Sequence, residues 1–361
     1  MMALAPHAAL AAPSRSSERE RVLEALKRHG WNTTSFQALE PGLSYFFQDE
    51  DACVAYADTG AAWVAAGAPI AEASRLDEVA RAFVRAARDR GRRACFFGAE
   101  ARFTAATEMR VARVAAQPVW DPARWVGEPR RRSVREQVRR ARAKEVVVRR
   151  LEPHELDAPA TRAKLEAALS EWISSRRMPR MKFLVDVELF AFKEERRTFV
   201  ASRGDEVVGA LGAVPVYARR GWFCEDVVRV PWAPNGTTEL LIDAAMRDFA
   251  ASGSRFATLG MVPLSGVGGA LARVRSLASF LYDFQGLERF RAKLDPLRAD
   301  PIFLVHPSGV SFLRSILDVL AAFAGRSLVG FGASALLRLL GLGRRVPRLA
   351  ARESILRATQ D

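Results

Sequence analysis

The chain has 361 residues but only three cysteines and four histidines, and this scarcity excludes several kinds of chemistry. Cys53, Cys95 and Cys224 are isolated and odd in number, and no CxxC or Cys/His spacing indicates a structural zinc site. They are expected to be reduced, buried thiols. The histidines are scattered, and no Ser-His-Asp order or HxxxD pair suggests histidine-based catalysis. We therefore expect neither a metal site nor a catalytic histidine.

Long apolar runs are missing as well. A bilayer-spanning helix needs roughly 20 apolar residues, and the nearest stretch, Ser327–Gly343, contains Arg338. Residues 1–13 are rich in alanine, lack a basic segment and are interrupted by Pro6 and His7. We therefore expect residues 1–17 to form a disordered tail rather than a signal peptide.

Acidic residues are in deficit. Lys and Arg number 55 against 41 Asp and Glu, so the net charge is +14 and the pI is near 10.6. Such an excess favours a polyanionic partner, either nucleic acid or an anionic membrane surface. The excess is densest in residues 129–150, where ten residues are basic and two are acidic. A solvated helix face is the alternative, but the single sign of charge favours a phosphate-binding helix that runs into a strand.

The hydrophobic pattern indicates that one α+β arrangement occurs twice. In the first half, apolar runs separated by turn residues predict antiparallel strands, followed by an amphipathic helix at Arg75–Arg90 and a buried strand at Ala94–Phe97. In the second half, a hairpin around Gly204-Asp205 and a strand at Gly221–Val230 precede a helix at Thr237–Ala251 and a further strand. We expect two domains, 18–128 and 151–306, joined by the basic segment 129–150 and followed by amphipathic helices in 307–361.

The strand–loop–helix at Asp226–Ala251 resembles the core of the GNAT acyltransferase fold, in which backbone N–H groups at a helix N-terminus face a pyrophosphate. The loop here is Pro231-Trp232-Ala233-Pro234-Asn235-Gly236. Its two prolines and single glycine leave few free N–H groups, so coenzyme A would be poorly held. The pattern favours this fold without the usual acyl-CoA.

Three ordered blocks make the resemblance more specific. They are Asp226-Val227-Val228-Arg229 with Ala233-Pro234-Asn235-Gly236 and Glu239; Leu259-Gly260-Met261-Val262-Pro263-Leu264-Ser265-Gly266; and Tyr282-Asp283-Phe284-Gln285-Gly286-Leu287 with Phe290, Lys293 and Pro296. They resemble the catalytic domain of the phosphatidylglycerol lysyltransferase family, and looser similarity covers about residues 20–306. Arg291 stands where the family commonly has lysine.

The resemblance implies tandem GNAT-like domains, each with a mixed, mostly antiparallel sheet flanked by helices. It also implies transfer of an amino acid from aminoacyl-tRNA to a phospholipid hydroxyl at the inner face of the cell membrane. Aminoacyl-tRNA would be the co-substrate, with no other cofactor. The expected partners are tRNA, an anionic membrane surface and a separate membrane flippase.

The resemblance and the chemistry of the transfer together suggest site residues. An activated ester needs alignment, proton removal and oxyanion stabilisation. Asp226 would grip the α-ammonium or remove a proton, Arg229 would bind the lipid phosphate, and Asn235 would be a turn residue or an amide donor. Three residues apart on an extended strand, Asp226 and Arg229 are expected on opposite faces.

The remaining predictions concern substrate binding. Residues expected to contact the substrates are Glu239, Met261, Ser265, Arg291 and Lys293, and those expected to contact tRNA are Arg131, Arg135, Arg139 and Arg142. Met261 is expected to shape the floor of the site. Glu239 is more readily explained as a helix-cap acid, and a solvated face is an alternative for Arg291 and Lys293. Gly286 is expected in a turn.

Residues 310–348 have apolar residues at helical spacing with arginines at the end, which suits a helix in the membrane interface or a hairpin packed on the protein. Three other functions remain open: an acyl-CoA-dependent GNAT enzyme, a Fem-like transferase acting on peptidoglycan precursors, and a non-catalytic membrane or nucleic-acid binding module. The amino acid moved, the acceptor and the oligomeric state are not determined by the sequence.

Overall fold

The computed structural model describes residues 15–128, 130–175, 183–184, 189–265 and 284–325. Most of the predicted tail, the end of the second motif block, the start of the third and the apolar stretch from residue 327 lie outside these ranges. The helix predicted from residue 18 begins at Arg15.

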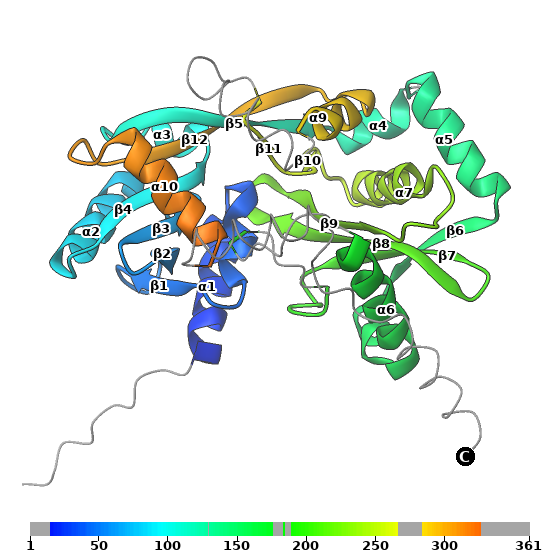
Figure 1. The fold of residues 1–361 in the computed structure, drawn as a ribbon, viewed down its shortest axis with the longest axis horizontal. Helices are drawn as coiled ribbons and strands as arrows, with labels where there is room; N and C mark the ends of the chain where they lie inside the picture. The colour runs from blue at the N-terminus through cyan, green and yellow to red at the C-terminus, as the bar shows by residue number, and fades with distance from the viewer. Residues whose placement is uncertain (1–14, 129, 176–182, 185–188, 266–283, 326–361) are drawn as a thin grey trace, which may run out of the picture.

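The described residues form one twelve-stranded sheet flanked by helices (Figure 1). The strands are β1 (Ser44–Phe47), β2 (Cys53–Asp58), β3 (Ala62–Ala66), β4 (Arg93–Ala99), β5 (Arg110–Trp120), β6 (Val146–Leu151), β7 (Arg197–Arg203), β8 (Glu206–Val216), β9 (Gly221–Arg229), β10 (Ala257–Thr258), β11 (Val262–Pro263) and β12 (Arg298–His306). The helices are α1 (Arg15–His29), α2 (Leu76–Asp89), α3 (Ala101–Thr104), α4 (Pro122–Gly127), α5 (Arg132–Ala143), α6 (Pro159–Ser175), α7 (Thr237–Ala251), α9 (Phe284–Lys293) and α10 (Phe312–Phe323). A 3₁₀ segment, η1, spans Thr33–Leu39.

The expected duplication is present in the backbone. In the first half β3 leads through α2 to β4, and β3 and β4 are parallel neighbours. In the second half β9 leads through α7 to β10, and these strands are again parallel neighbours. The other pairs are antiparallel, including the β1–β2–β3 meander and the β7–β8 hairpin. The chain is therefore an α+β protein with two GNAT-like halves.

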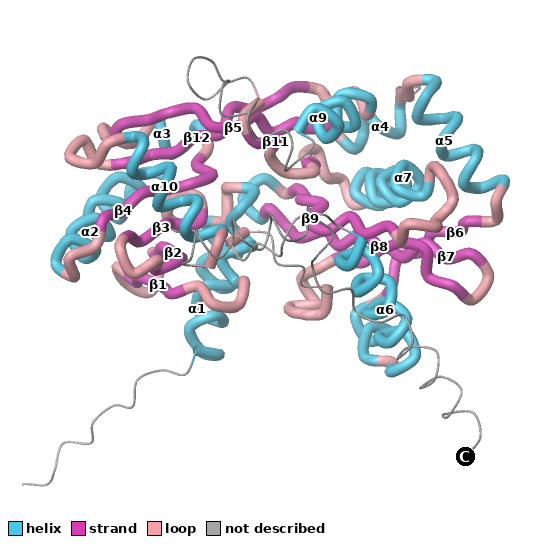
Figure 2. The backbone as a smooth tube through the Cα atoms, viewed as in Figure 1, coloured by secondary structure: helices cyan, strands magenta, loops and turns pink. Residues whose placement is uncertain are grey.

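The two halves exchange a strand, which the sequence did not predict. The sheet order is β1-β2-β3-β4-β12-β5-β10-β9-β8-β7-β6. β5, which precedes the basic helix in the chain, pairs with β10 of the second half, whereas β12 pairs with β4 of the first half. β5 and β12 also pair with each other over nine residue pairs. Figure 2 shows these strands running between the halves, so the sheet is continuous across the predicted boundary.

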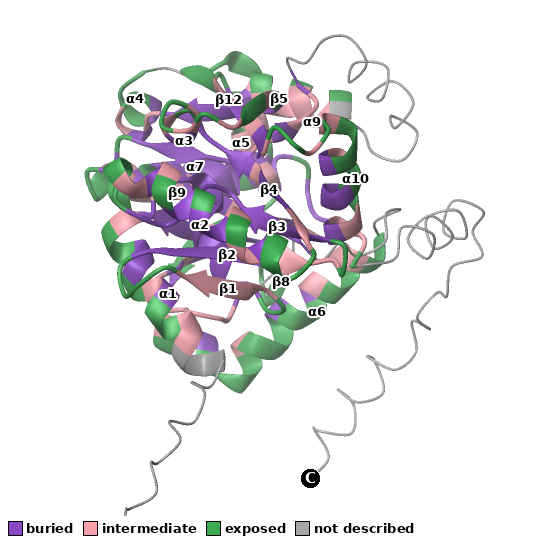
Figure 3. Ribbon diagram, turned by 90° about the vertical axis from the view of Figure 1, so that its left-hand side faces the viewer, coloured by how far each residue is buried: buried purple, intermediate pink, exposed green. Residues whose placement is uncertain are grey.

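Helices cover both faces of the sheet in the second half. α7 packs on one face through Leu241, Met246 and Phe249, while α6 packs on the other through Leu165 and Ala168. In Figure 3 the strands are mostly buried and the outer helix faces are exposed, as amphipathic patterns predict. The helix predicted at Arg75–Arg90 corresponds to α2, whose apolar side is buried.

A buried ion pair joins the two halves. Arg219, which follows β8, donates to Glu100 at 2.8 Å, and its guanidinium also lies 3.6 Å from Asp300 on β12. Glu100 also accepts the backbone N–H of Thr33. Burial raises the pKa of the Glu100 carboxyl above its usual value despite the adjacent arginine, and burial lowers the pKa of Arg219. Each charged group of this pair is therefore stabilised in the protein interior by the other, and removing one would leave the other buried without a counter-charge.

The structure places the three cysteines and Gly286. All three cysteines are free and buried, and burial raises the pKa of Cys53 and Cys224 to about 12. The turn expected at Gly286 is wrong, because this residue lies inside α9. Among the described residues, no helix is long and apolar enough to cross a bilayer.

Candidate active site

The two central parallel strands of the second half diverge. β10 pairs with β9 only at Trp222 and Phe223. After β10 the chain turns away from β9, and the next strand, β11, pairs with β5 through Val262 and Pro263. Within the described ranges, no strand covers this edge of β9 beyond Phe223. The first motif block lies along this edge, so the divergence opens the sheet beside the predicted catalytic residues.

Asp226 and Arg229 lie on opposite faces of β9, as the sequence predicted. Asp226 pairs in register with Gly212 and packs against it on the side away from α7, where it is 6% exposed. Arg229 pairs with Gly209 on the face covered by α7. Its Nη2 donates to the carbonyl of Ala233 at 2.8 Å, and its Nε is buried with no hydrogen-bond partner. Among the described residues, Arg229 forms no ion pair with an acid.

A bulge on β9 adds a second carboxylate that the sequence analysis missed. The register with β8 shifts between Gly212 and Ala213, and Glu225 is the extra residue on β9. Its Oε2 accepts from Nη1 of Arg196 at 2.6 Å, and both side chains are 4% exposed. No local sequence pattern predicts this pair, because a bulge depends on how two strands are paired.

The loop between β9 and α7 contacts the basic helix. Gly236 has φ +93°, and a Cβ placed on it would lie 1.9 Å from the carbonyl oxygen of Gln137 in α5. Any side chain here would collide with the α5 backbone, so a glycine is required. Asn235, the preceding residue, is exposed. The contact brings the predicted phosphate-binding helix directly against the predicted catalytic loop.

The basic helix is attached along a narrow apolar stripe. Val134 and Ala141 are buried, whereas the arginines predicted to bind tRNA are exposed. Three of the four contact acids: Arg131 pairs with Asp295 at 2.8 Å, Arg139 with Glu136 at 3.0 Å, and Arg142 with the buried Asp243 at 3.7 Å. The first two pairs are exposed, and such pairs contribute about 0–1 kcal/mol each, so a phosphate can compete with them. A cavity of about 370 Å³ lies between α4, α5 and α7, and Arg135 lines it.

Several residues predicted to bind substrate form hydrogen bonds or ion pairs with other residues of the chain. Lys293 of α9 pairs with Glu239 of α7 at 2.7 Å. Arg291 donates to the carbonyls of Leu259 and Gly260. Ser265 donates to Glu288 at 2.7 Å. These contacts tie α9 to α7 and to the second motif block, so the motif blocks form one neighbourhood.

Met261 lies between the halves. Its methyl group is 3.4 Å from the Cβ position of Gly98 on β4, close to Thr34. Met261 therefore lies where the second motif block meets the first half, and its part in the floor of the site stays a prediction.

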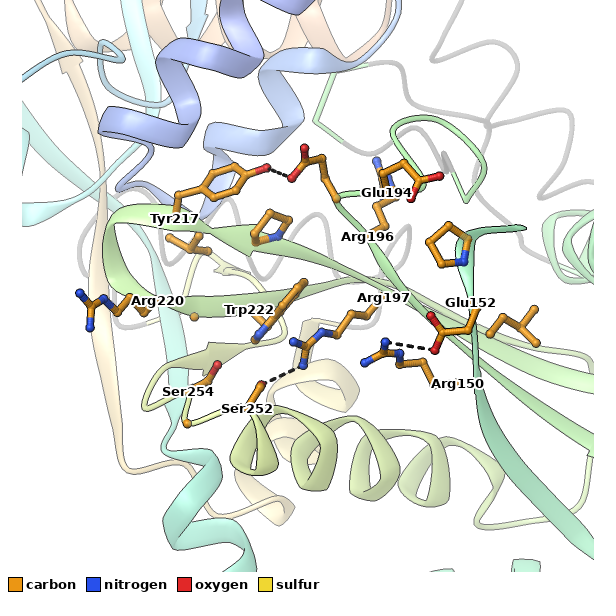
Figure 4. A pocket seen from close by; sticks show the side chains of 17 residues that line it. Arg150, Glu152, Glu194, Arg196, Arg197, Tyr217, Arg220, Trp222, Ser252 and Ser254 are labelled. Carbon is orange, nitrogen blue, oxygen red and sulfur yellow. Dashed lines mark hydrogen bonds and ion pairs between the residues drawn. The ribbon is translucent and has the colours of Figure 1, made fainter. Parts of the chain in front are cut away.

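Another cavity, of about 670 Å³, lies at the C-terminal end of α7 (Figure 4). A helix of this length separates its two ends by about 20 Å. Arg197 donates hydrogen bonds to Asp248 and Ser252, and its guanidinium lies over the ring of Trp222. Arg150 donates to Glu152. None of the predicted site residues lines it, and we assign it no role. No cluster of metal-ligating side chains is found among the described residues.

Comparison with known proteins identifies the family. The model of the family described as phosphatidylglycerol lysyltransferase, C-terminal, matches residues 23–306. The chain belongs to the phosphatidylglycerol lysyltransferase C-terminal domain family. A search of curated proteins finds no significant match.

Solved structures agree with this assignment. The C-terminal domain of a putative lysylphosphatidylglycerol synthetase from Agrobacterium fabrum superposes with a TM-score of 0.74 at 18% identity, covering 87% of this chain and 99% of that one. The structure of L-PGS from Bacillus licheniformis gives 0.71 at 19% identity, covering 84% and 96%. A conserved protein of unknown function from Bacteroides thetaiotaomicron gives 0.55 at 11% identity, covering 81% and 97%. These likenesses show the shared fold.

Membership of the lysyltransferase family makes the chain a transferase and connects it with aminoacyl transfer to lipid. The match contains all residues predicted for catalysis, substrate binding and tRNA binding. Their individual roles remain predictions.

Proposed function

We propose that this protein transfers an amino acid from aminoacyl-tRNA to a hydroxyl group of a membrane phospholipid. The observation that carries the proposal is the contact between α5 and the loop before α7, at Gln137 and Gly236. A polyanion bound along α5 would lie beside Asn235 and Gly236 in the loop that follows β9. Transfer RNA is a polyanion whose 3′ end carries the activated ester.

The acyl-CoA alternative is disfavoured by the same loop. Pro231 and Pro234 have no N–H, and the N–H groups of Ala233 and Thr237 already donate to Val230 and Pro234. The Gln137 carbonyl oxygen then faces Gly236. A pyrophosphate needs N–H donors at the helix start, whereas this loop offers few donors and an acceptor from α5.

The lipid phosphate would bind Arg229. Its Nε is buried without a hydrogen-bond partner, which is costly unless an anion completes the shell. A planar guanidinium binds phosphate with two parallel hydrogen bonds. Replacing Arg229 with lysine keeps the charge but removes the fork. Loss of one charge-assisted hydrogen bond predicts at least about tenfold loss of transfer, with near-normal tRNA binding. Full transfer by Arg229→Ala would contradict the phosphate role.

Membrane contact is supported by α10. Ser315 and Val319 face the protein, Phe323 packs edge-to-face on Phe97 at 5.5 Å, and Asp318 pairs with Arg93. The opposite side presents a stripe of exposed leucines: Leu313, Leu317 and Leu320. An exposed apolar stripe on a well-anchored helix suits insertion into a membrane interface.

The central test compares donors. The purified protein is incubated with vesicles containing phosphatidylglycerol and either labelled aminoacyl-tRNA or labelled acetyl-CoA. We expect labelled lipid with the tRNA donor, abolished by ribonuclease, and none with acetyl-CoA. Lipid or amine labelling from acetyl-CoA alone would contradict the proposal. Profiling lipids with and without the expressed protein then identifies the amino acid and the acceptor.

A further inference from the structure

We propose that Glu225 binds the α-ammonium of the amino acid being transferred, and so selects donors that carry a free amino group. The proposal rests on the aminoacyl-transfer function proposed above and names a specificity residue for it. Glu225 has no part in the motif blocks, and its position is set by the bulge on β9.

The bulge turns Glu225 to the same side of the sheet as Asp226. Arg197, the first residue of β7, lies over Trp222 on the face covered by α7, whereas the guanidinium of Arg196, directly before β7, lies over the ring of Phe36 in η1. Glu225 bonds Arg196, and Asp226 packs on Gly212 on that face. Bulges next to active sites commonly re-aim a side chain in this way. Two consecutive carboxylates, about 3.8 Å apart at their Cα atoms, thereby face one region.

Arg196 holds the Glu225 carboxylate in place, but only one of the two carboxylate oxygens has a hydrogen-bond partner. Arg196 donates to its Oε2 at 2.6 Å, while Nε of Arg196 donates to the carbonyl of Ala191 and its guanidinium lies over the ring of Phe36. The other carboxylate oxygen, Oε1, is buried with no hydrogen-bond partner. A buried acceptor without a donor is costly, and Arg196 satisfies only one of the two oxygens of Glu225. The position therefore fits a ligand with N–H donors.

An ammonium group meets this requirement. It carries three donors and a positive charge, so it can bond Oε1 of Glu225 and also reach the Asp226 carboxylate. The α-ammonium is common to every aminoacyl donor, whichever amino acid is moved. A fixed carboxylate is preorganised for it, because Arg196 prevents Glu225 from turning away.

The experiment compares Glu225→Gln with the wild-type protein. Glutamine keeps the shape and an oxygen for Arg196 but loses the charge. Probes are glycinamide, whose only cation is the α-ammonium, and N-acetylglycinamide, measured by calorimetry and as inhibitors of transfer. We expect wild type to prefer glycinamide and Glu225→Gln to lose that preference by roughly 10- to 150-fold, the range for a charge-assisted hydrogen bond. The control is Glu100→Gln, which alters a similarly buried Arg–Glu pair.

The outcomes separate the two proposals. Equal preference for glycinamide in wild type and Glu225→Gln would overturn the role of Glu225, even if transfer from tRNA is observed. Glycinamide preference in wild type but not in the variant, with no transfer from any charged tRNA, would support Glu225 and refute the transfer function. If Glu225→Gln does not fold, Glu225→Asp provides the test: the shortened carboxylate should weaken glycinamide binding, and unchanged binding would overturn the proposal.

Discussion

Replacement of Gly236 with alanine is expected to push α5 away from the loop before α7. The residue has φ +93°, and the new Cβ would lie 1.9 Å from the carbonyl oxygen and 2.6 Å from the carbonyl carbon of Gln137. Cβ atoms are essentially never found within 3.0 Å of such atoms. The helix or the loop must therefore shift by about 1 Å, because the packed interface has no spare room.

The magnitude follows from two costs. An alanine held at a left-handed φ costs about 1–3 kcal/mol, and overpacking costs about 1–3 kcal/mol more. We expect the free energy of unfolding to fall by about 2–6 kcal/mol. A 1 Å misplacement near reacting groups can reduce a rate by about 10²-fold, so transfer should fall by that order while the α5 arginines still bind tRNA.

Gly253 provides the matched control. It lies just beyond the other end of α7 with φ +76°, and a Cβ there would meet nothing within 4 Å. Gly253→Ala should therefore show the backbone cost alone, with normal transfer. Denaturant unfolding, tRNA binding and transfer from aminoacyl-tRNA to lipid are measured for both variants. If Gly236→Ala matches Gly253→Ala in stability and in transfer, the reasoning from the α5 contact is refuted.

Three further predictions follow from the charges and exposed surfaces. Arg219→Met should reduce the free energy of unfolding by about 3–5 kcal/mol near neutral pH, because it leaves Glu100 buried and uncompensated. Burial raises the pKa of Glu100, so the folded protein holds a proton that the unfolded chain has lost, and the stability from this group is lost as pH rises. The loss in Arg219→Met should accordingly shrink toward pH 4.5, and a loss independent of pH in denaturant melts would contradict this. Neutralising the four α5 arginines should lower the slope of log K against log salt for tRNA by up to about 0.9 per phosphate contact removed; an unchanged slope would assign α5 to a solvated face. Leu317→Asp should weaken flotation with anionic vesicles several-fold without changing the melting temperature, and unchanged flotation would exclude α10 from the membrane contact.

Most helices and strands can be predicted from the sequence because their formation depends on residues that are close together in the chain. The alternation in the first half and the hairpin at Gly204 predicted β1–β3 and β7–β8. Helical spacing predicted α2 and α7, and the single sign of charge in 129–150 predicted an exposed basic helix. The motif blocks indicate the family because their residues are close together in the sequence. The turn predicted at Gly286 is wrong, because this residue lies in α9. Glycine disfavours helices by its local preference, but tertiary packing can outweigh that preference.

The sequence by itself determined the element order, the duplication, the basic helix and the family motifs, since each is encoded over short distances. The exchange of β5 and β12 was decided by tertiary structure, because strand pairing between distant segments leaves no local pattern. The same holds for the two contacts on which the proposals rest. The contact of Gly236 with Gln137 joins segments about 100 residues apart, and the placement of Glu225 beside Arg196 depends on a one-residue register shift against β8. Only the packed chain brings these groups together, because register and close approach are properties of pairs of segments.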